Sequence, residues 1–105
     1  MIIETVVYDE IQYPCVYEDG DFSLYIEDNT IGWILHGYVY NWKPSTYKKI
    51  LSCILDVLDE APHSSLFVIS DNDKLTKFAS MFGMEVIDTF MDSKGNQGDL
   101  LCLTL

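Results

Sequence analysis

The chain contains no arginine, and its six lysines stand against seventeen acidic residues, so its formal net charge is −11 over 105 residues. Proteins that bind nucleic acid use Lys and Arg to displace counterions from phosphates. Anionic membrane surfaces attract the same basic residues. The shortage of positive charge therefore argues against direct binding to a nucleic-acid backbone and against binding to a membrane.

Cysteines and long apolar runs are also scarce. Cys15, Cys53 and Cys102 are widely spaced and odd in number, and neither histidine lies at zinc-ligand spacing from them. The sequence therefore predicts neither a disulfide framework nor a metal site. The N-terminus lacks the regions of a signal peptide, and no apolar stretch approaches the ~20 residues that span a bilayer. These features predict a cytoplasmic protein.

Hydrophobic residues make up 49% of the chain, which is enough to build a core, and the length fits a single domain over residues 1–105. Apolar alternation, β-branched residues and short apolar runs predict strands at 2–8, 22–27, 30–40, 65–70, 85–91 and 100–105. Asp28 and Asn29 predict the turn between the second and third strands. The continuous apolar run at 65–70 predicts a strand that is buried on both faces.

Two segments show helical periodicity. The first spans 45–60, with Ser45 as its predicted N-cap and an apolar stripe formed by Tyr47, Ile50, Leu51, Ile54, Leu55 and Leu58. The second begins after Asp71 or Asn72 and ends near Gly83, and Leu75, Phe78, Ala79 and Phe82 form its stripe.

The predicted order is β-β-β-α-β-α-β-β. This order indicates an α/β (α+β) fold with a mixed, mainly antiparallel sheet and two helices, because strand–helix–strand in the middle requires a parallel crossover. We expect strands 30–40 and 65–70 to be the parallel pair and to splay near the start of the first helix. The edges of such a sheet leave homodimer formation through the N-terminal segment or the last strand open.

The second half resembles the GNAT superfamily of N-acetyltransferases. Asn72 lies eleven residues before Gly83, which Met84 follows, and this spacing is similar to the family's Asn-x-x-Ser to Gly-Phe motif. The His36-Gly37 pair is similar to one found in small phage-encoded members. The resemblance covers residues 22–105 and implies a trimmed GNAT-like fold and a phage protein, located in the host cytoplasm or the virion.

The sequence departs from the family where catalysis would occur. The resemblance places the acetyl-CoA loop at residues 41–47, but this segment has no Gly, Arg or Gln. Pro44 also removes a backbone donor. Ala79 stands where the family often has a tyrosine proton donor, and no helices of an acceptor lobe fit between residues 8 and 22. The resemblance therefore implies a domain that has lost acetyltransferase activity and has no cofactor.

If the chain does bind acetyl-CoA, we expect the ligand in the splay. Tyr38, Tyr40, Asn41, Lys43 and Ser45 would line it, and the binding residues would be Tyr40, Asn41, Lys43, Ser45, Lys48 and Asn72. Lys43, Lys48 and Lys49 cluster at the start of the first helix, where they would hold an anion or form a solvated face. His36 and Tyr38 are the candidate catalytic residues, with His36 as a general base or as a hydrogen-bonded strand residue.

Three functions remain open. The first is a GNAT-like interaction or assembly component that recognises a protein partner. The second is an acetyl-CoA-dependent N-acetyltransferase with a non-standard pyrophosphate loop. The third is an acidic mimic of nucleic acid that inhibits a host protein, for which the charge of −11 is the motive.

Overall fold

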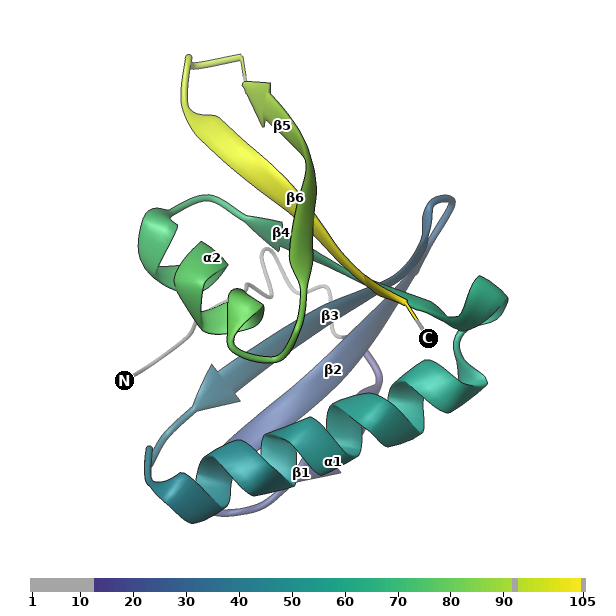
Figure 1. Cartoon of the computed structure of the whole chain (residues 1–105), viewed down its shortest axis with the longest axis vertical. Helices are drawn as coiled ribbons and strands as arrows, with labels where there is room; N and C mark the ends of the chain where they lie inside the picture. The colour runs from purple at the N-terminus through teal and green to yellow at the C-terminus, as the bar shows by residue number, and fades with distance from the viewer. Residues whose placement is uncertain (1–12, 92, 105) are drawn as a thin grey trace.

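The computed structural model of the chain describes residues 13–91 and 93–104. The elements in this part are, in order, β1 (Cys15–Glu18), β2 (Phe22–Asn29), β3 (Gly32–Val39), α1 (Pro44–Glu60), the 3₁₀ turn η1 (Pro62–Ser64), β4 (Ser65–Ser70), α2 (Asp73–Ser80), β5 (Glu85–Met91) and β6 (Gln97–Thr104) (Figure 1). The predicted fold class is confirmed. The strand predicted at 2–8 lies outside the described residues, and β1 is a strand that the sequence analysis missed.

The strands form one sheet in the order β1-β2-β3-β4-β6-β5. Every neighbouring pair is antiparallel except β3 and β4, so the predicted mixed, mainly antiparallel sheet is confirmed. The last strand, β6, pairs with β4 on one side and with β5 on the other. The sequence analysis had left open that the last strand is an edge of the sheet. It is not, because β5 has the outer position.

The parallel pair splays as predicted. β3 and β4 are in register only at Trp33↔Leu66 and Ile34↔Phe67, near the beginning of both strands. Beyond these pairs the two strands diverge, and α2 lies beside the opening (Figure 1). The opening lies toward the end of β3, from which the chain continues into α1.

The turn between β2 and β3 consists of Thr30 and Ile31 rather than the predicted Asp28 and Asn29. Asp28 and Asn29 instead end β2, and the side-chain oxygen of Asn29 accepts hydrogen bonds from both turn residues. Gly32 follows with φ +135°, and a Cβ there would lie 2.8 Å from the ring of Phe67. Only glycine fits this position without strain.

Helix α1 begins at Pro44, and Lys43 takes the N-cap position without a side-chain cap. The prediction of Ser45 as N-cap is wrong because Pro44, with its fixed φ and missing N–H, already fits the first helical position. Residues with nearly helical spacing on one face are buried, namely Thr46, Ile50, Ile54 and Leu58. Leu55 is 48% exposed, so the predicted stripe was too wide on that side.

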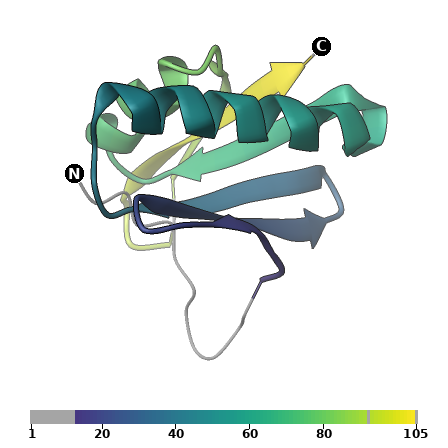
Figure 2. The ribbon, with the colours of Figure 1, turned by 90° about the horizontal axis from the view of Figure 1, so that it is seen from below.

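Both helices cover the same face of the sheet (Figure 2). The core lies between this face and the helices, and β2, β3, β4 and β6 contribute Phe22, Leu24, Ile26, Leu35, Val39, Leu66, Val68 and Leu101 to it. β4 is buried only in alternation, since Ile69 on its other face is 41% exposed. The prediction that this strand is buried on both faces is wrong, because no helix covers the second face in the described part of the chain.

Among residues 13–91 and 93–104, neither helix has the length and apolarity that a bilayer crossing requires.

Candidate functional sites

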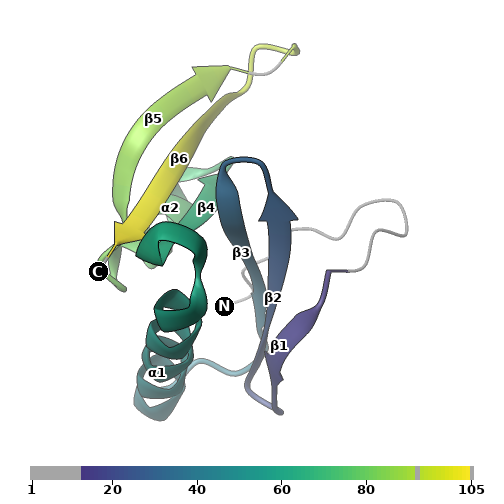
Figure 3. The same cartoon turned by 90° about the vertical axis from the view of Figure 1, so that its right-hand side faces the viewer.

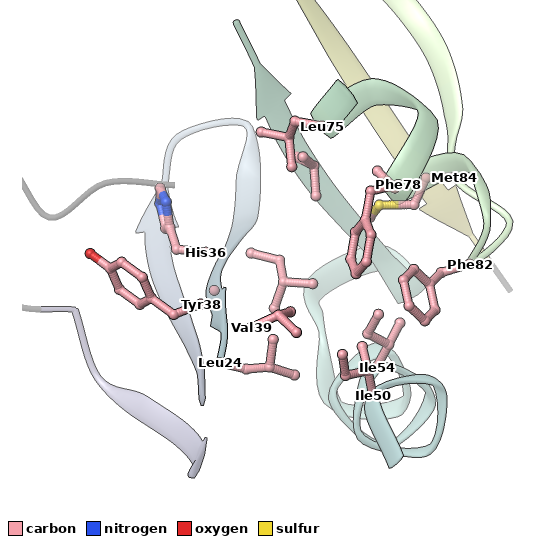
Figure 4. A pocket seen from close by; sticks show the side chains of 14 residues that line it. Leu24, His36, Tyr38, Val39, Ile50, Ile54, Leu75, Phe78, Phe82 and Met84 are labelled. Atoms are coloured by element: carbon pink, nitrogen blue, oxygen red, sulfur yellow. The ribbon is translucent and has the colours of Figure 1, made fainter. Parts of the chain in front are cut away.

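The splay between β3 and β4 opens onto an apolar cavity of about 50 Å³. Its lining comes from β2, β3, β4, both helices and the segment after α2, and includes Leu24, Val39, Ile50, Ile54, Leu75, Phe78, Phe82 and Met84. Figure 4 shows the aromatic rings of α2 and its following turn directed toward the aliphatic side chains of α1. Side chains of the core thus occupy most of the splay.

The residues that line this cavity differ from those predicted to line a ligand site in the splay. Of Tyr38, Tyr40, Asn41, Lys43 and Ser45, only Tyr38 lies at the cavity, and the lining is otherwise apolar apart from His36. The side chains of His36 and Tyr38 point to the opposite side of β3, away from the other lining residues (Figure 4). Small-molecule sites usually enclose roughly 300–1,000 Å³, so this cavity is far too small for an acyl thioester of a nucleotide.

Two of the three lysines clustered near the start of α1 contact carboxylates of the turn between β1 and β2. Lys49 Nζ lies 3.2 Å from Asp19 Oδ2 and 3.1 Å from Asp21 Oδ2, and Lys43 Nζ lies 3.5 Å from Asp21 Oδ2. Asn41 also donates to Asp21 through its amide, at 3.1 Å. The anion beside these lysines is therefore supplied by the chain itself.

Backbone donors in front of α1 are directed to the same turn. The N–H groups of Tyr40 and Asn41 both donate to the carbonyl oxygen of Asp21, at 2.7 and 3.1 Å. Pro44 has no N–H, and the N–H groups of Thr46 and Tyr47 donate to the carbonyl of Lys43. The N–H groups of these four residues are thus bonded within the chain, whereas an anion at a helix N-terminus needs N–H groups that are not.

The turn itself is held by hydrogen bonds to Asp19. Its Oδ1 accepts from the N–H of Asp21 at 2.7 Å and from that of Phe22 at 3.2 Å, and its Oδ2 accepts from the Tyr17 hydroxyl at 2.9 Å. The hydrogen bond from the Asp21 backbone is the largest cause that holds the pKa of Asp19 down to about 2. Hydrogen bonds from Tyr17 and Lys49 add to this effect and outweigh the opposing effect of burial.

His36, a candidate catalytic residue, is bound to Glu27 across the β2–β3 pair. Its Nε2 lies 2.9 Å from Glu27 Oε1, and the ring of Tyr13 stacks on the imidazole at 4.5 Å. Asn29 donates to the other oxygen of Glu27 at 2.9 Å. Burial opposes ionisation of Glu27, but the hydrogen bonds from Asn29 and His36 prevail and lower its pKa.

This arrangement leaves His36 little freedom to act as a base. Its Nδ1 is buried and has no hydrogen-bond partner in the described part of the chain, while Nε2 is bonded to Glu27. The ring therefore has no nitrogen directed at an open site. Its catalytic role stays a prediction, and the geometry favours a structural imidazole that joins Glu27 to Tyr13.

Tyr38 and Tyr40, which the sequence analysis assigned to catalysis and to cofactor binding, lie on the helix-free face of the sheet. Tyr38 packs edge-on against Tyr25 at 6.1 Å between ring centroids and stacks with Tyr40 at 6.3 Å. The hydroxyl of Tyr40 is hydrogen-bonded to that of Ser23 at 2.9 Å. The tyrosines thus form a row on the face away from the cavity.

Asn72, another predicted binding residue, caps α2. Its side-chain oxygen accepts from the N–H of Leu75 at 2.8 Å, as its position before the helix predicts. The remaining predicted binding residues, Ser45 and Lys48, are exposed on the first turn and a half of α1. The structure thus brings Asn41 and Lys43 together at Asp21, but the side chain of Tyr40 packs on Tyr38 and Asn72 caps α2.

A wider hollow of about 590 Å³ lies between the β1–β2 side of the sheet and the second half of α1. Its lining combines two aromatic side chains with four carboxylates, namely Tyr13, Trp33, Glu27, Asp28, Asp56 and Glu60. The described residues contain no cluster of three metal-ligating side chains. The sequence analysis missed this hollow, because its walls come from segments about 30 residues apart.

Asp19 and Asp21 were also missed as partners of the lysines. Nothing in the local sequence pairs Asp19 with Lys49, which lies thirty residues later. Comparison of the chain with protein-family models, with curated proteins and with solved structures finds no match.

Proposed function

We propose that the chain is a non-catalytic, GNAT-like domain that acts by binding another protein. The observation that carries this proposal is the edge strand β5, in which all seven residues are exposed. Val86, Ile87, Phe90 and Met91 are its exposed large apolar residues. An exposed apolar sheet edge marks either an interaction site or an aggregation hazard.

The geometry at the start of α1 supports a function without CoA. Asp19 and Asp21 already pair with Lys43 and Lys49, and bound phosphate would have to displace these carboxylates. The cavity in the splay is small and apolar, and core side chains fill its surroundings. The chain thus offers neither unpaired charges at Lys43 and Lys49 to bind a cofactor phosphate nor a cavity large enough for CoA.

The alternative function is an acetyl-CoA-dependent N-acetyltransferase with a non-standard pyrophosphate loop. One observation favours it: β3 and β4 splay after only two pairs, next to the start of α1. A loop built on Lys43, Lys48 and Lys49 would then have to exchange its internal carboxylates for phosphates. This exchange would require the turn at Asp19 to move.

A thermal-shift titration with acetyl-CoA and with CoA at millimolar concentration separates the two functions. We expect no shift. A ligand present at 100 times its Kd would stabilise the native state by roughly 2.7 kcal/mol, which is several degrees for a domain of this size.

The control for this titration is a pair of double variants. Lys43→Ala with Lys48→Ala removes the candidate anion site, and Lys74→Ala with Lys77→Ala removes two exposed lysines from α2. A shift that the first pair abolishes and the second pair keeps would overturn the non-catalytic proposal and establish CoA binding.

A further inference from the structure

Strand β5 offers more open edge than any other strand of the described chain. The opposite edge, β1, has four residues and an irregular register, whereas β5 has seven. The β5–β6 hairpin extends away from α1 and past the tips of β2 and β3 (Figure 3). A partner can therefore reach β5 without contacting the helices.

The regular part of this edge runs from Asp88 to Met91. These four residues pair one-to-one with Leu100 through Gln97, whereas the register shifts between Val86 and Asp88. The bulge leaves Ile87 55% exposed beside the regular part. An added strand would follow the regular part, since a bulge interrupts the spacing of backbone donors and acceptors.

The side chain of Asp88 accepts a hydrogen bond from a backbone N–H within this regular part. The N–H of Thr89 donates to Asp88 Oδ1 at 2.8 Å, so the side chain of one edge residue satisfies the donor of the next. A charged side chain on an edge strand protects that edge from unspecific pairing. A strand that pairs here must replace this bond with a carbonyl oxygen of its own, and a cation on that strand would then compensate the freed Asp88 carboxylate.

We propose that Asp88–Met91 is the docking strand for an extended segment of another protein in which apolar residues alternate with Lys or Arg. This inference rests on the proposed function and names the chemistry of its partner. The cationic side chain pairs with Asp88, the Thr89 N–H turns to the added backbone, and the apolar side chains cover Ile87 and Met91. Strand addition of this kind takes affinity from the main chain and specificity from alternate side chains.

Charge selects this partner over a second copy of the chain. β5 carries Glu85 and Asp88 and no basic residue, and the whole chain has a net charge of −11. Association of two copies through β5 would bring together two chains that each carry this excess of acid, and like charges repel. A basic segment is attracted to the same edge instead.

Phe90 has a structural role and is not a suitable test residue. Its ring covers Gly98 on β6, where a Cβ would approach the ring to 2.4 Å. Removing Phe90 would therefore disturb the hairpin. Asp88 and Thr89 are better targets, because both are exposed on the edge.

The test is an NMR titration of the full chain with two synthetic peptides of seven residues, the length of β5. One peptide alternates Val with Lys, and the other alternates Val with Glu. We expect the Val–Lys peptide to shift the amide signals of Asp88–Met91 and to bind at least fivefold more tightly than the Val–Glu peptide. Equal binding, no binding at millimolar peptide, or shifts confined to other strands would each overturn the proposal.

Two variants make the test specific to this edge. Asp88→Lys should reverse the preference between the peptides, whereas the matched control Asp59→Lys, an exposed acid of α1, should keep it. Thr89→Pro removes the edge donor and should abolish binding. An unchanged preference in Asp88→Lys would overturn the proposal even if Thr89→Pro does not fold.

Sedimentation of the chain without peptide tests whether a second copy of the chain occupies β5 instead. If the chain forms a dimer and Ile87→Lys dissociates it, a second copy occupies β5. This result would overturn the proposal that a basic segment binds there. The CoA titration reports on the proposed function separately: CoA binding would refute that function, whereas failure of the peptide test alone would refute only the partner chemistry.

Discussion

Single carboxylates of the β1–β2 turn neutralise lysines near the start of α1, and Asp19 is the clearest example. Its side chain accepts two backbone N–H bonds and a tyrosine hydroxyl and also contacts Lys49. These bonds favour the charged form and lower its pKa from 3.8 to about 2. Asp19, in the turn between β1 and β2, is therefore an ordered internal counter-ion for Lys49.

We predict that the stability contributed by Asp19 is lost in acid. Because its folded pKa is depressed, this contribution is complete above the unfolded value of 3.8 and disappears as the pH falls through about 2. Urea midpoints measured at several pH values should fall over this window and fall less in Asp19→Asn. Asp59→Asn, which changes one exposed charge on α1, should retain the wild-type dependence; the same slope in all three proteins would contradict the prediction.

At the scale of elements, side-chain hydrogen bonds fix where the helices begin and which strands they contact. Asn72 caps α2, and Thr76 on α2 lies 2.7 Å from Ser70 Oγ on β4 and 2.9 Å from Asp99 Oδ2 on β6. These bonds tie the short helix α2 to the two strands beneath it. Helix α1 has no side-chain cap and depends on Pro44 and on its buried stripe.

Replacement of Asn72 by Ala should therefore cost about 1 kcal/mol of unfolding free energy, the usual effect of removing an N-cap. Asn72→Ser keeps an oxygen that can accept from Leu75 N and should recover most of the loss. Equilibrium unfolding in urea measures both values. If Asn72→Ala were as stable as the wild type, the cap bond would not contribute to the stability of α2.

At the scale of the whole molecule, the charge of −11 acts against the compact state. The chain has seventeen acids and six lysines, and Lys43 and Lys49 are already paired at the β1–β2 turn. Repulsion among the remaining carboxylates is long-ranged and screened by salt. Folding brings these charges closer than they are in the unfolded chain.

We therefore expect the Tm to rise as NaCl increases from about 10 mM to about 150 mM, over which the Debye length shortens from about 30 Å to about 8 Å. Salt also weakens the lysine–carboxylate pairs, but exposed pairs contribute little, so the repulsion should dominate. Differential scanning calorimetry gives the Tm values. A Tm that falls with salt would show that the ion pairs at the turn outweigh the net charge.

Much of the fold could be predicted because the patterns are local. The period of the apolar residues predicted α1, Asp71 or Asn72 was predicted to cap α2, and the bounds of β5 were correct. The β2–β3 turn was displaced by two residues, since Asp28 and Asn29 are typical turn residues but their side chains here support a neighbouring turn. The burial of β4 was overestimated, because the run at 65–70 does not reveal which face the helices cover.

Less of the candidate site could be predicted. Asn41 and Lys43 were named as binding residues and do lie together, but their partner Asp21 comes from a turn twenty residues earlier. His36 was named as a candidate base, but its bond to Glu27 depends on the register of β2 and β3. Contacts across a sheet or between a turn and a helix do not appear in local spacing.

The order of the elements from β2 onward, the α+β class, the two amphipathic helices and the excess of acid could be read from the sequence. These properties follow from periodicity, capping residues and composition, which act within a few residues along the chain. The tertiary structure alone decided that the lysines of α1 face Asp19 and Asp21, that core side chains fill the splay, and that β5 rather than the last strand is the open edge. Strand order and register bring distant residues into contact, and they are fixed only when the whole sheet closes against its helices.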